Sequence, residues 1–200
     1  INLQNLKRKG ELRQSILAPP GYQIVVCDSS QIEARVLAWL AGQDDLLQVF
    51  ANKQDPYKLM AAEAFNKPVD QVTSDERFIG KICVLGLGYG MGAVKFQETL
   101  HLGTMGPSVD IPLEQAQAIV RIYRRKNYAI SNFWKIANSM ITSLATNVRG
   151  TYKCLEYNNK RIKVPGNLWL YYPGLKFTCQ MVDDEVVETY YSYTSKNGRN

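Results

Sequence analysis

Two carboxylates near the start of the chain stand where they could do chemistry. Asp28 directly follows the apolar stretch 24–27, and Glu33 comes five residues later. The apolar stretch predicts a short buried strand, and the apolar residues that recur on one face over 32–40 predict a helix. A carboxylate at the mouth of such a strand-to-helix turn is open to solvent on one side and rigid behind. Asp28 is therefore a candidate metal ligand.

Both carboxylates also have a purely structural interpretation. An Asp at the end of a strand is often a turn residue or a helix cap. Ser30 and Glu33 have the spacing of a capping box, in which Glu33 would only complete the start of the helix. This stretch alone leaves the two interpretations open.

A second stretch carries cations at helical spacing. Thr73 and Glu76 form another capping-box pattern. The segment after them predicts a helix that ends in a glycine-rich run. Four residues fall along one stripe at steps of four, namely Arg77, Lys81, Leu85 and Tyr89. Arg77 and Lys81 lie one turn apart and can bind a triphosphate. The other two side chains form a flat apolar surface on which a sugar and a base can pack. The stripe predicts nucleotide binding, and its alternative is a solvated helical face.

Glycines at every second position from Gly86 to Gly92 follow this stripe. Each weakens a helix by about 1 kcal/mol relative to Ala. We therefore expect the far end of the helix to bend, as in a lid that closes over a nucleotide. The run imitates a dinucleotide-binding loop, but it lacks the GxGxxG order, and no GxxxxGK[ST] loop occurs in the chain.

Composition narrows the class of protein. The chain has 200 residues, 46% of them hydrophobic, with a net charge of +6, 12 Tyr and 3 Trp. A basic surface with interleaved aromatics points to a polyanion such as nucleic acid. Four cysteines without CxxC spacing and a single histidine exclude a zinc finger, a His-based hydrolase triad and a secreted disulfide scaffold. With no apolar run near 18 residues, we expect no membrane partner and a reducing, cytoplasmic compartment.

The remaining elements follow from local signals. Asp55 and Pro56 predict the start of a helix that ends at 66–68. A single long helix is predicted over 113–148, and its basic run 121–126 is either a solvated face or a surface that tracks a nucleic-acid backbone. After Gly150 the pattern predicts two or three short strands and then a hairpin. Both ends of the chain look cut from something longer.

Three segments together resemble the DNA polymerase I family, or family A. DSSQIEARVLAWLAG is similar to its motif A, D-x-S-Q-I-E-x-R, and RFIGKICVLGLGYG is similar to its motif B, R-x-x-x-K-x-x-x-[hydrophobic]-G-x-x-Y-G. The residues 2–5 match the N-L-Q-N that precedes motif A. The resemblance covers about 1–135, and the rest resembles viral or prophage members more loosely. For a viral protein the expected compartment is the cytoplasm of the host cell.

The resemblance implies roles for the motif A residues. Asp28 corresponds to the palm carboxylate that bridges two Mg²⁺ ions, with the Ser29 carbonyl beside it. Glu33 corresponds to a steric gate that closes over the sugar C2′ position, favours deoxynucleotides and hydrogen-bonds Tyr89. Gln31 would contact the nucleotide as a supporting residue, and Arg35 would be a second supporting residue.

The motif B residues receive nucleotide-binding roles in the same way. Arg77 and Lys81 would contact the incoming triphosphate, and Lys81 would also act catalytically by protonating the departing pyrophosphate. Leu85 stands where the family often has Phe or Tyr, against the sugar, and Tyr89 completes the nucleotide site. Tyr57 replaces a His that is common in the family's fingers.

The family's second metal-binding carboxylate comes from a His-Asp-Glu motif C, which the sequence does not show. Asp184 and Glu185 are the candidate substitute, although Asp183 occupies the place of the His. We interpret them as a solvent-facing strand pair. Neither an exonuclease nor a thumb is recognisable.

We therefore expect an α+β chain, an incomplete right-hand polymerase fold with a small antiparallel palm sheet and mainly helical fingers. Residues 1–42 would start the palm with motif A, 43–135 would form the fingers with motif B, and 136–200 would return toward the palm. The expected function is template-directed DNA polymerase, which adds deoxynucleotides to a primer 3′-hydroxyl by two-metal phosphoryl transfer. Its partners would be primer-template DNA, dNTP and a missing C-terminal palm segment with motif C, so the chain alone is expected to be inactive.

Two alternatives differ in class. The chain would be a catalytically incomplete DNA- or dNTP-binding fragment if motif C is absent. It would otherwise be a relative of single-subunit RNA polymerases, which share the Arg, Lys and Tyr residues of the stripe. Glu33 argues against the RNA polymerase, because a carboxylate there would clash with a ribose 2′-hydroxyl.

Overall fold

The computed structural model describes residues 11–182 and 185–194. The chain divides into two compact units, 1–32 and 33–200, which we describe separately. The described part of the first unit contains the short helix α1 (Glu11–Gln14) and a long segment without regular structure, turned by a hydrogen bond from Tyr22 N–H to the Pro19 carbonyl.

The strand predicted over 24–27 is wrong for the described part of the chain. This segment is irregular, and Val25 and Val26 are 78% and 82% exposed. A β-strand requires hydrogen bonds to a neighbouring strand, and none of the described strands pairs with the segment 24–27. The apolar pattern indicated burial, but it could not supply a partner.

The helix after Asp28 also begins later than the capping-box pattern suggests. Gln31 has a φ of 55°, in the left-handed region, and α2 begins after it at Ile32. The Ile32 N–H donates to the Ser29 carbonyl at 3.3 Å. A non-glycine residue at such a φ is uncommon and sets the direction in which the chain enters the helix.

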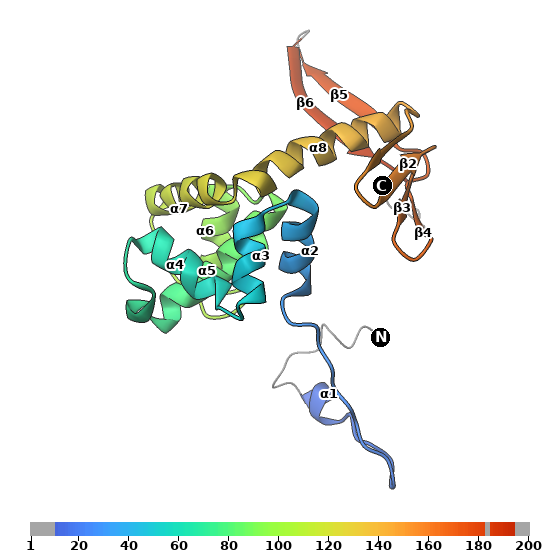
Figure 1. Cartoon of the computed structure of the whole chain (residues 1–200). Helices are drawn as coiled ribbons and strands as arrows, with labels where there is room; N and C mark the ends of the chain where they lie inside the picture. Colours follow the sequence, from blue (N-terminus) through green and yellow to red (C-terminus); the bar gives the residue numbers. More distant parts are fainter. Residues whose placement is uncertain (1–10, 183–184, 195–200) are drawn as a thin grey trace. The chain divides into compact units, whose positions relative to one another are not determined.

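The second unit consists of a helical body followed by two small sheets (Figure 1). The helical elements are α2 (Ile32–Ala41), α3 (Asp44–Ala51), α4 (Pro56–Phe65), η2 (Val69–Gln71), α5 (Ser74–Gly86), η3 (Leu87–Tyr89), α6 (Ala93–His101), α7 (Leu113–Lys126) and α8 (Tyr128–Ala145). The core lies where α4, α5, α6 and α7 meet, and its largest fully buried side chains include Tyr123, Phe96, Ile82 and Leu100. None of the helices that the structure describes is both long enough and apolar enough to cross a bilayer.

Helix α4 confirms the start and end predicted from its sequence. The Asp55 carboxylate accepts hydrogen bonds from the N–H groups of Tyr57 at 2.9 Å and Lys58 at 3.2 Å, while Pro56 occupies the first turn. Asn66 ends the helix in the left-handed conformation, which closes its last carbonyls.

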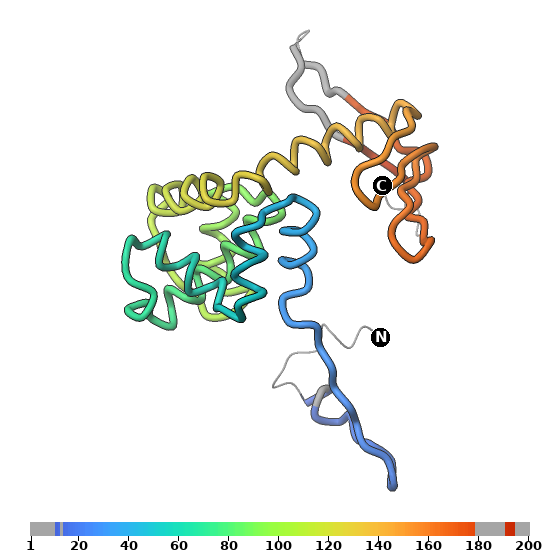
Figure 2. Tube along the Cα trace, viewed as in Figure 1, coloured from blue at the N-terminus to red at the C-terminus, as the bar shows by residue number. Residues whose placement is uncertain are grey.

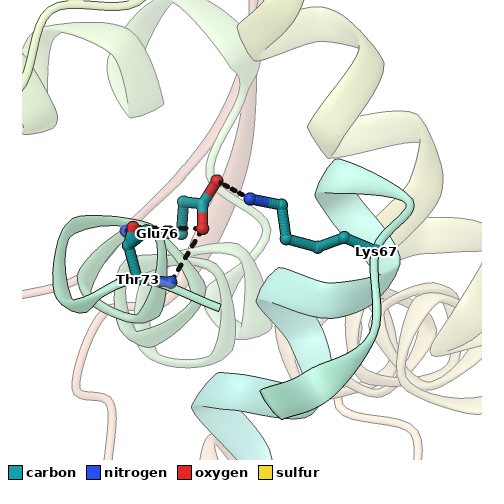
Figure 3. Close-up of polar contacts among 3 residues, drawn as sticks. All are labelled: Lys67, Thr73 and Glu76. Carbon is teal, nitrogen blue, oxygen red and sulfur yellow. Dashed lines mark hydrogen bonds and ion pairs between the residues drawn. The ribbon is translucent and has the colours of Figure 1, made fainter. Parts of the chain in front are cut away.

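Helix α5 begins with the capping box predicted from Thr73 and Glu76. The Glu76 N–H donates to the Thr73 hydroxyl at 3.3 Å, and the Thr73 N–H donates back to the Glu76 carboxylate at 2.9 Å. The other carboxylate oxygen accepts a hydrogen bond from Lys67 at 2.6 Å, as Figure 3 shows. A cation from the end of α4 therefore fixes the start of the helix that carries the cationic stripe.

We expect Glu76→Gln to make folding less sensitive to acid. The hydrogen bond from Lys67, followed by that from the Thr73 backbone, holds the pKa of Glu76 below the ordinary glutamate value of 4.5. Because the pKa is lower in the folded state, the carboxylate contributes stability above its unfolded value, and that contribution is lost as the pH falls through the folded value. Glutamine keeps the capping box, so the variant should lose less than about 1 kcal/mol at neutral pH.

Urea unfolding at neutral pH and at about pH 3.5 checks this prediction. The loss of stability between the two should be smaller in Glu76→Gln than in the wild type. Asp75→Asn, an exposed carboxylate in the same first turn, is the matched control and should keep the wild-type loss. An equal loss in Glu76→Gln and the wild type would contradict the assignment.

The single helix predicted over 113–148 is wrong, because the structure divides it into α7 and α8 at Asn127. This buried residue leaves the helical conformation at φ −101° and ψ 53°, and its side chain donates to the Tyr123 carbonyl at 3.1 Å. Gln43, which is 2% exposed, spans the break. Its amide group donates to the Lys126 carbonyl at 3.3 Å, and its oxygen accepts from Ala129 N–H at 3.0 Å. The break is therefore imposed from outside the helix.

The chain after α8 forms two antiparallel sheets, and the trace in Figure 2 follows it from α8 into the first of them. Four consecutive strands make the first sheet, namely β1 (Gly150–Tyr152), β2 (Leu155–Asn158), β3 (Arg161–Val164) and β4 (Leu168–Tyr171). The second is the hairpin of β5 (Lys176–Val182) and β6 (Glu185–Ser192). The predicted short strands and the hairpin after them are present, but the first sheet has four strands where two or three were predicted. The α+β class is confirmed.

The turn between β1 and β2 closes the end of α2. The Tyr152 hydroxyl donates to the Leu40 carbonyl at 3.0 Å, and the Lys153 ammonium donates to the Trp39 carbonyl at 2.7 Å. These carbonyls lack intrahelical partners at the helix end. The first sheet thereby holds the helix that carries Glu33.

Candidate functional site

The two ends of the predicted nucleotide site meet between α2 and η3. The Tyr89 hydroxyl donates to the Glu33 carboxylate at 3.1 Å, a contact between residues 56 positions apart. Tyr89 is 70% exposed, but the loss of water around its hydroxyl, followed by the hydrogen bond and charge of Glu33, raises the pKa of Tyr89. The phenol therefore stays protonated at neutral pH and acts as the donor. The hydrogen bond that the family resemblance implied is present.

An open groove of about 470 Å³ lies beside this pair. Leu85 and Tyr89 line it together with Glu33, as the stripe predicted, and Met91 and Met105 add apolar surface. The groove combines the carboxylate of Glu33 with a broad apolar surface. Such a surface can receive the sugar and base of a nucleotide better than it can receive a phosphate.

Lys95 also lines the groove, although no motif in the sequence predicts it there. It lies in α6, after the glycine-rich turn, and its ammonium is 3.2 Å from the Glu98 carboxylate. Both side chains are more than half exposed, so this ion pair is weak. The only signal in the sequence is a cation shortly after the glycines.

One contact and one glycine conformation hold the position of Tyr89. The Trp134 indole N–H on α8 donates to the Gly88 carbonyl at 2.9 Å, which ties η3 to the long helix. Gly90 follows with a φ of 81°, a conformation that glycine adopts at no cost and that stops the 3-10 turn. The prediction that the helix ends among the glycines is confirmed, because α5 ends at Gly86.

Arg77 lies in an ion pair rather than along an open stripe. Its Nε donates to the Asp55 carboxylate at 2.6 Å, and its guanidinium lies 5.4 Å from the centre of the Tyr57 ring. Burial alone would raise the pKa of Asp55, but the Arg77 hydrogen bond and the N–H groups of α4 lower it overall. Sequence reasoning missed Asp55 as a partner, since its signal was that of a helix cap.

Lys81 is the cation of the stripe that remains available. It lies half-buried on α5, one turn after Arg77, and makes no ion pair with the residues that the structure describes. Because a guanidinium has five N–H donors, Arg77 can also bind an anion while its Nε contacts Asp55. The two cations remain one helical turn apart, as expected.

The motif A residues Asp28, Ser29 and Gln31 belong to the first unit. Asp28 and Ser29 are exposed, and Gln31 is half-buried. Carboxylate and carbonyl oxygens are the ligands that Mg²⁺ prefers, so the donor type fits. Across residues 11–182 and 185–194, however, no group of three or more His, Cys, Asp and Glu side chains is placed to hold a metal.

The remaining predicted residues do not complete this set. Asp184 lies outside the described residues, and Glu185 is the first residue of β6. In the basic run of α7, Arg121, Arg124 and Arg125 are exposed. Lys126 there pairs with Glu63 at 3.2 Å.

Comparison with known proteins gives the family. The family model described as DNA polymerase family A matches residues 1–151. DNA polymerase I of Pseudomonas aeruginosa is 43% identical over 96 residues, which are 46% of this chain and 10% of that protein. The DNA polymerase of Bacillus phage SP02 is 35% identical over 127 residues, 62% of this chain and 18% of that protein.

The thermostable DNA polymerase I of Thermus aquaticus is 34% identical over 126 residues, 61% of this chain and 14% of that protein. The chain thus spans between a tenth and a fifth of the length of these relatives.

A solved structure shows the same fold. The POL domain of Pol1 from M. smegmatis, in complex with DNA primer-template and dNTP, has a TM-score of 0.59 and 22% identity. The similarity covers 86% of this chain and 27% of that one. It confirms the expected α+β polymerase fold. Because the family model covers three quarters of its length, the chain belongs to DNA polymerase family A.

Proposed function

We propose that this chain is the palm-start and fingers portion of a template-directed DNA polymerase. Residues 1–42 would begin the palm, 43–135 would form the fingers, and 136–200 would lead back toward the palm. The observation that supports this function best is the Tyr89–Glu33 hydrogen bond beside the groove lined by Leu85. The names of its relatives point the same way, as DNA polymerases of bacteria and a phage.

The pair would select the sugar of the incoming nucleotide. The Tyr89 hydroxyl holds the Glu33 carboxylate at the rim of the groove, where Leu85 would receive the sugar. A ribose 2′-hydroxyl would have to displace this carboxylate, whereas a deoxyribose leaves it in place. We therefore propose dNTP rather than ribonucleotide as the substrate.

Charge on α5 would hold the triphosphate. Lys81 would bind it as a point charge, and Arg77 would bind it through the donors that Asp55 does not use. Lys81 would also give a proton to the departing pyrophosphate. We propose Mg²⁺ as the metal, with Asp28 and the Ser29 carbonyl as the ligands from this chain and further ligands from a palm segment with motif C.

We expect Glu33→Ala to reduce the preference for deoxynucleotides. The wild-type chain with primer-template DNA should bind dATP more tightly than ATP. In the variant the ratio of the two affinities should fall by about tenfold. Equilibrium titration of both nucleotides measures it. Tyr89→Phe keeps the ring but loses the hydrogen bond, so it should give a smaller loss.

Glu114→Ala is the matched control, because Glu114 is an exposed glutamate in the first turn of α7 that does not line the groove. It should bind both nucleotides as the wild type does. Equal affinity of the wild type for dATP and ATP, or an unchanged preference in Glu33→Ala, would refute the proposed gate.

Primer extension tests the catalytic role of Asp28. With Mg²⁺ and primer-template DNA, we expect no extension by this chain alone but retained nucleotide binding. Extension that vanishes in Asp28→Asn would instead mean that a second carboxylate acts within the chain and would favour Asp184 and Glu185. Loss of both binding and extension would contradict the proposed function.

A further inference from the structure

Positive charge accumulates in one part of the chain. Residues 115–182 contain a single acidic side chain, Glu156. The same stretch contains the lysines and arginines Arg121, Arg124, Arg125, Lys126, Lys135, Arg149, Lys153, Lys160, Arg161, Lys163 and Lys176. So strong an imbalance favours a polyanionic partner.

Strand register gathers part of this charge on one face of the first sheet. Directly paired residues in an antiparallel sheet lie on the same face, and Lys163 pairs with both Glu156 and Trp169. Arg161 likewise pairs with Asn158 and Tyr171. We call the face formed by Arg161, Lys163, Trp169 and Tyr171 the basic-aromatic face.

The opposite face of the sheet is used for packing in β2 and β3, whereas Leu168 and Leu170 of β4 on that face are 66% and 48% exposed. Leu155 and Ile162 belong to it, because side chains alternate along a strand. They line an apolar cavity of about 320 Å³ together with Phe133 and Leu144 of α8. The basic-aromatic face is therefore turned away from α8, and Tyr171 on it is 60% exposed.

Cations and rings alternate closely on this face. The Arg161 guanidinium lies 4.3 Å from the centre of the Trp169 ring, and the Lys163 ammonium lies 6.0 Å from it. Lys163 also makes a long contact of 3.4 Å with Glu156, which is more than half exposed, so this pair is weak. Neither cation is held by a strong ion pair.

We propose that the basic-aromatic face binds single-stranded DNA. Trp169 and Tyr171 are two positions apart on β4, about 6.7 Å, which is twice the spacing of stacked bases. Bases that stack on both rings must therefore be unstacked from each other, as a single strand allows and a duplex does not. Arg161 and Lys163 would contact the phosphates of the same strand.

This surface is separate from the nucleotide groove, because none of its residues lines that groove. The inference therefore does not depend on the proposed polymerase activity. We take the strand to be DNA because the chain belongs to a DNA polymerase family.

Fluorescence anisotropy with the 200-residue chain tests the proposal. The probes are a labelled thymidine oligomer of about twelve nucleotides and a duplex of the same length. The single strand should bind at least about tenfold more tightly than the duplex. Trp169→Ala and Tyr171→Ala should each weaken single-strand binding by about tenfold. Arg161→Ala should lower the slope of log affinity against log salt by about 0.7.

Two further variants separate binding from folding. Trp169→Phe keeps a ring on the face and should retain most of the affinity, but the quenching of tryptophan fluorescence by DNA should fall. Glu156→Gln removes the carboxylate that pairs with Lys163 and should tighten binding about threefold at low salt. A purely structural role for the face would not predict a gain of affinity.

The matched controls lie elsewhere. Tyr22→Ala removes an exposed tyrosine in the first unit, and Lys58→Ala removes a lysine of α4; both should bind DNA as the wild type does. Equal binding of duplex and single strand would overturn the proposal. Wild-type affinity in Trp169→Ala and Tyr171→Ala, or an equal loss in Tyr22→Ala, would also overturn it.

Discussion

We expect Gly80→Ala to lower the free energy of unfolding by about 3 kcal/mol. A Cβ atom at Gly80 would lie 2.1 Å from the Tyr57 carbonyl oxygen and 3.1 Å from the Ala61 nitrogen. Both are backbone atoms of α4, so no side chain can rotate away. Alanine gains about 1 kcal/mol over glycine in helix propensity, but the forced separation of α4 and α5 costs more.

Urea unfolding followed by circular dichroism measures this effect. Gly92→Ala is the matched control, because nothing lies within 4 Å of a Cβ there, and it should change stability by less than about 1 kcal/mol. A stable Gly80→Ala would show that α4 and α5 can move apart. The variant should also disturb the Arg77–Asp55 pair, which spans the same two helices.

We expect Gln43→Leu to cost about 2–4 kcal/mol of stability. The buried amide of Gln43 donates to Asp45 at 2.7 Å and to the Lys126 carbonyl, and it accepts from Ala129 and Ile130. Leucine has a similar size, so packing is largely kept while these hydrogen bonds are lost. The backbone groups at the break between α7 and α8 would then be buried without partners.

Thermal and urea unfolding check this prediction against Gln48→Leu. Gln48 is an exposed glutamine on α3, so its substitution should change stability by about 0.5 kcal/mol or less. A small effect of Gln43→Leu would mean that water or a shift of α8 replaces the lost hydrogen bonds. A large effect would show that the hydrogen bonds of Gln43 stabilise the junction of α7 and α8.

Local signals in the sequence predicted several elements correctly. The Asp55–Pro56 start of α4, the Thr73–Glu76 capping box and the glycine-rich end of α5 all depend on residues within one or two turns. Backbone groups at a helix end need partners at once, so the chemistry that provides them is nearby in sequence. The order and spacing of residues in the two motifs were also sufficient to identify the family.

The predictions that were wrong concern features that depend on residues far apart in the sequence. The break at Asn127 depends on Gln43, 83 residues before Lys126, and no local pattern over 113–148 reveals it. The segment 24–27 has the composition of a strand, but a strand requires a neighbour that its own residues cannot specify. Arg77 looked like a free cation, because its distance to Asp55 depends on how α4 packs on α5.

Residue types and their spacing were thus enough to predict the family, several helix ends and three side chains that line the groove, Glu33, Leu85 and Tyr89, but not Lys95. Which of these side chains meet depends on the folded chain: Glu33 with Tyr89, Arg77 with Asp55, and Arg161 with Trp169. The physical reason is the separation in sequence over which each interaction acts. Caps and periodicity act over a few residues, whereas a hydrogen bond across 56 positions exists only once the core has brought two helices together.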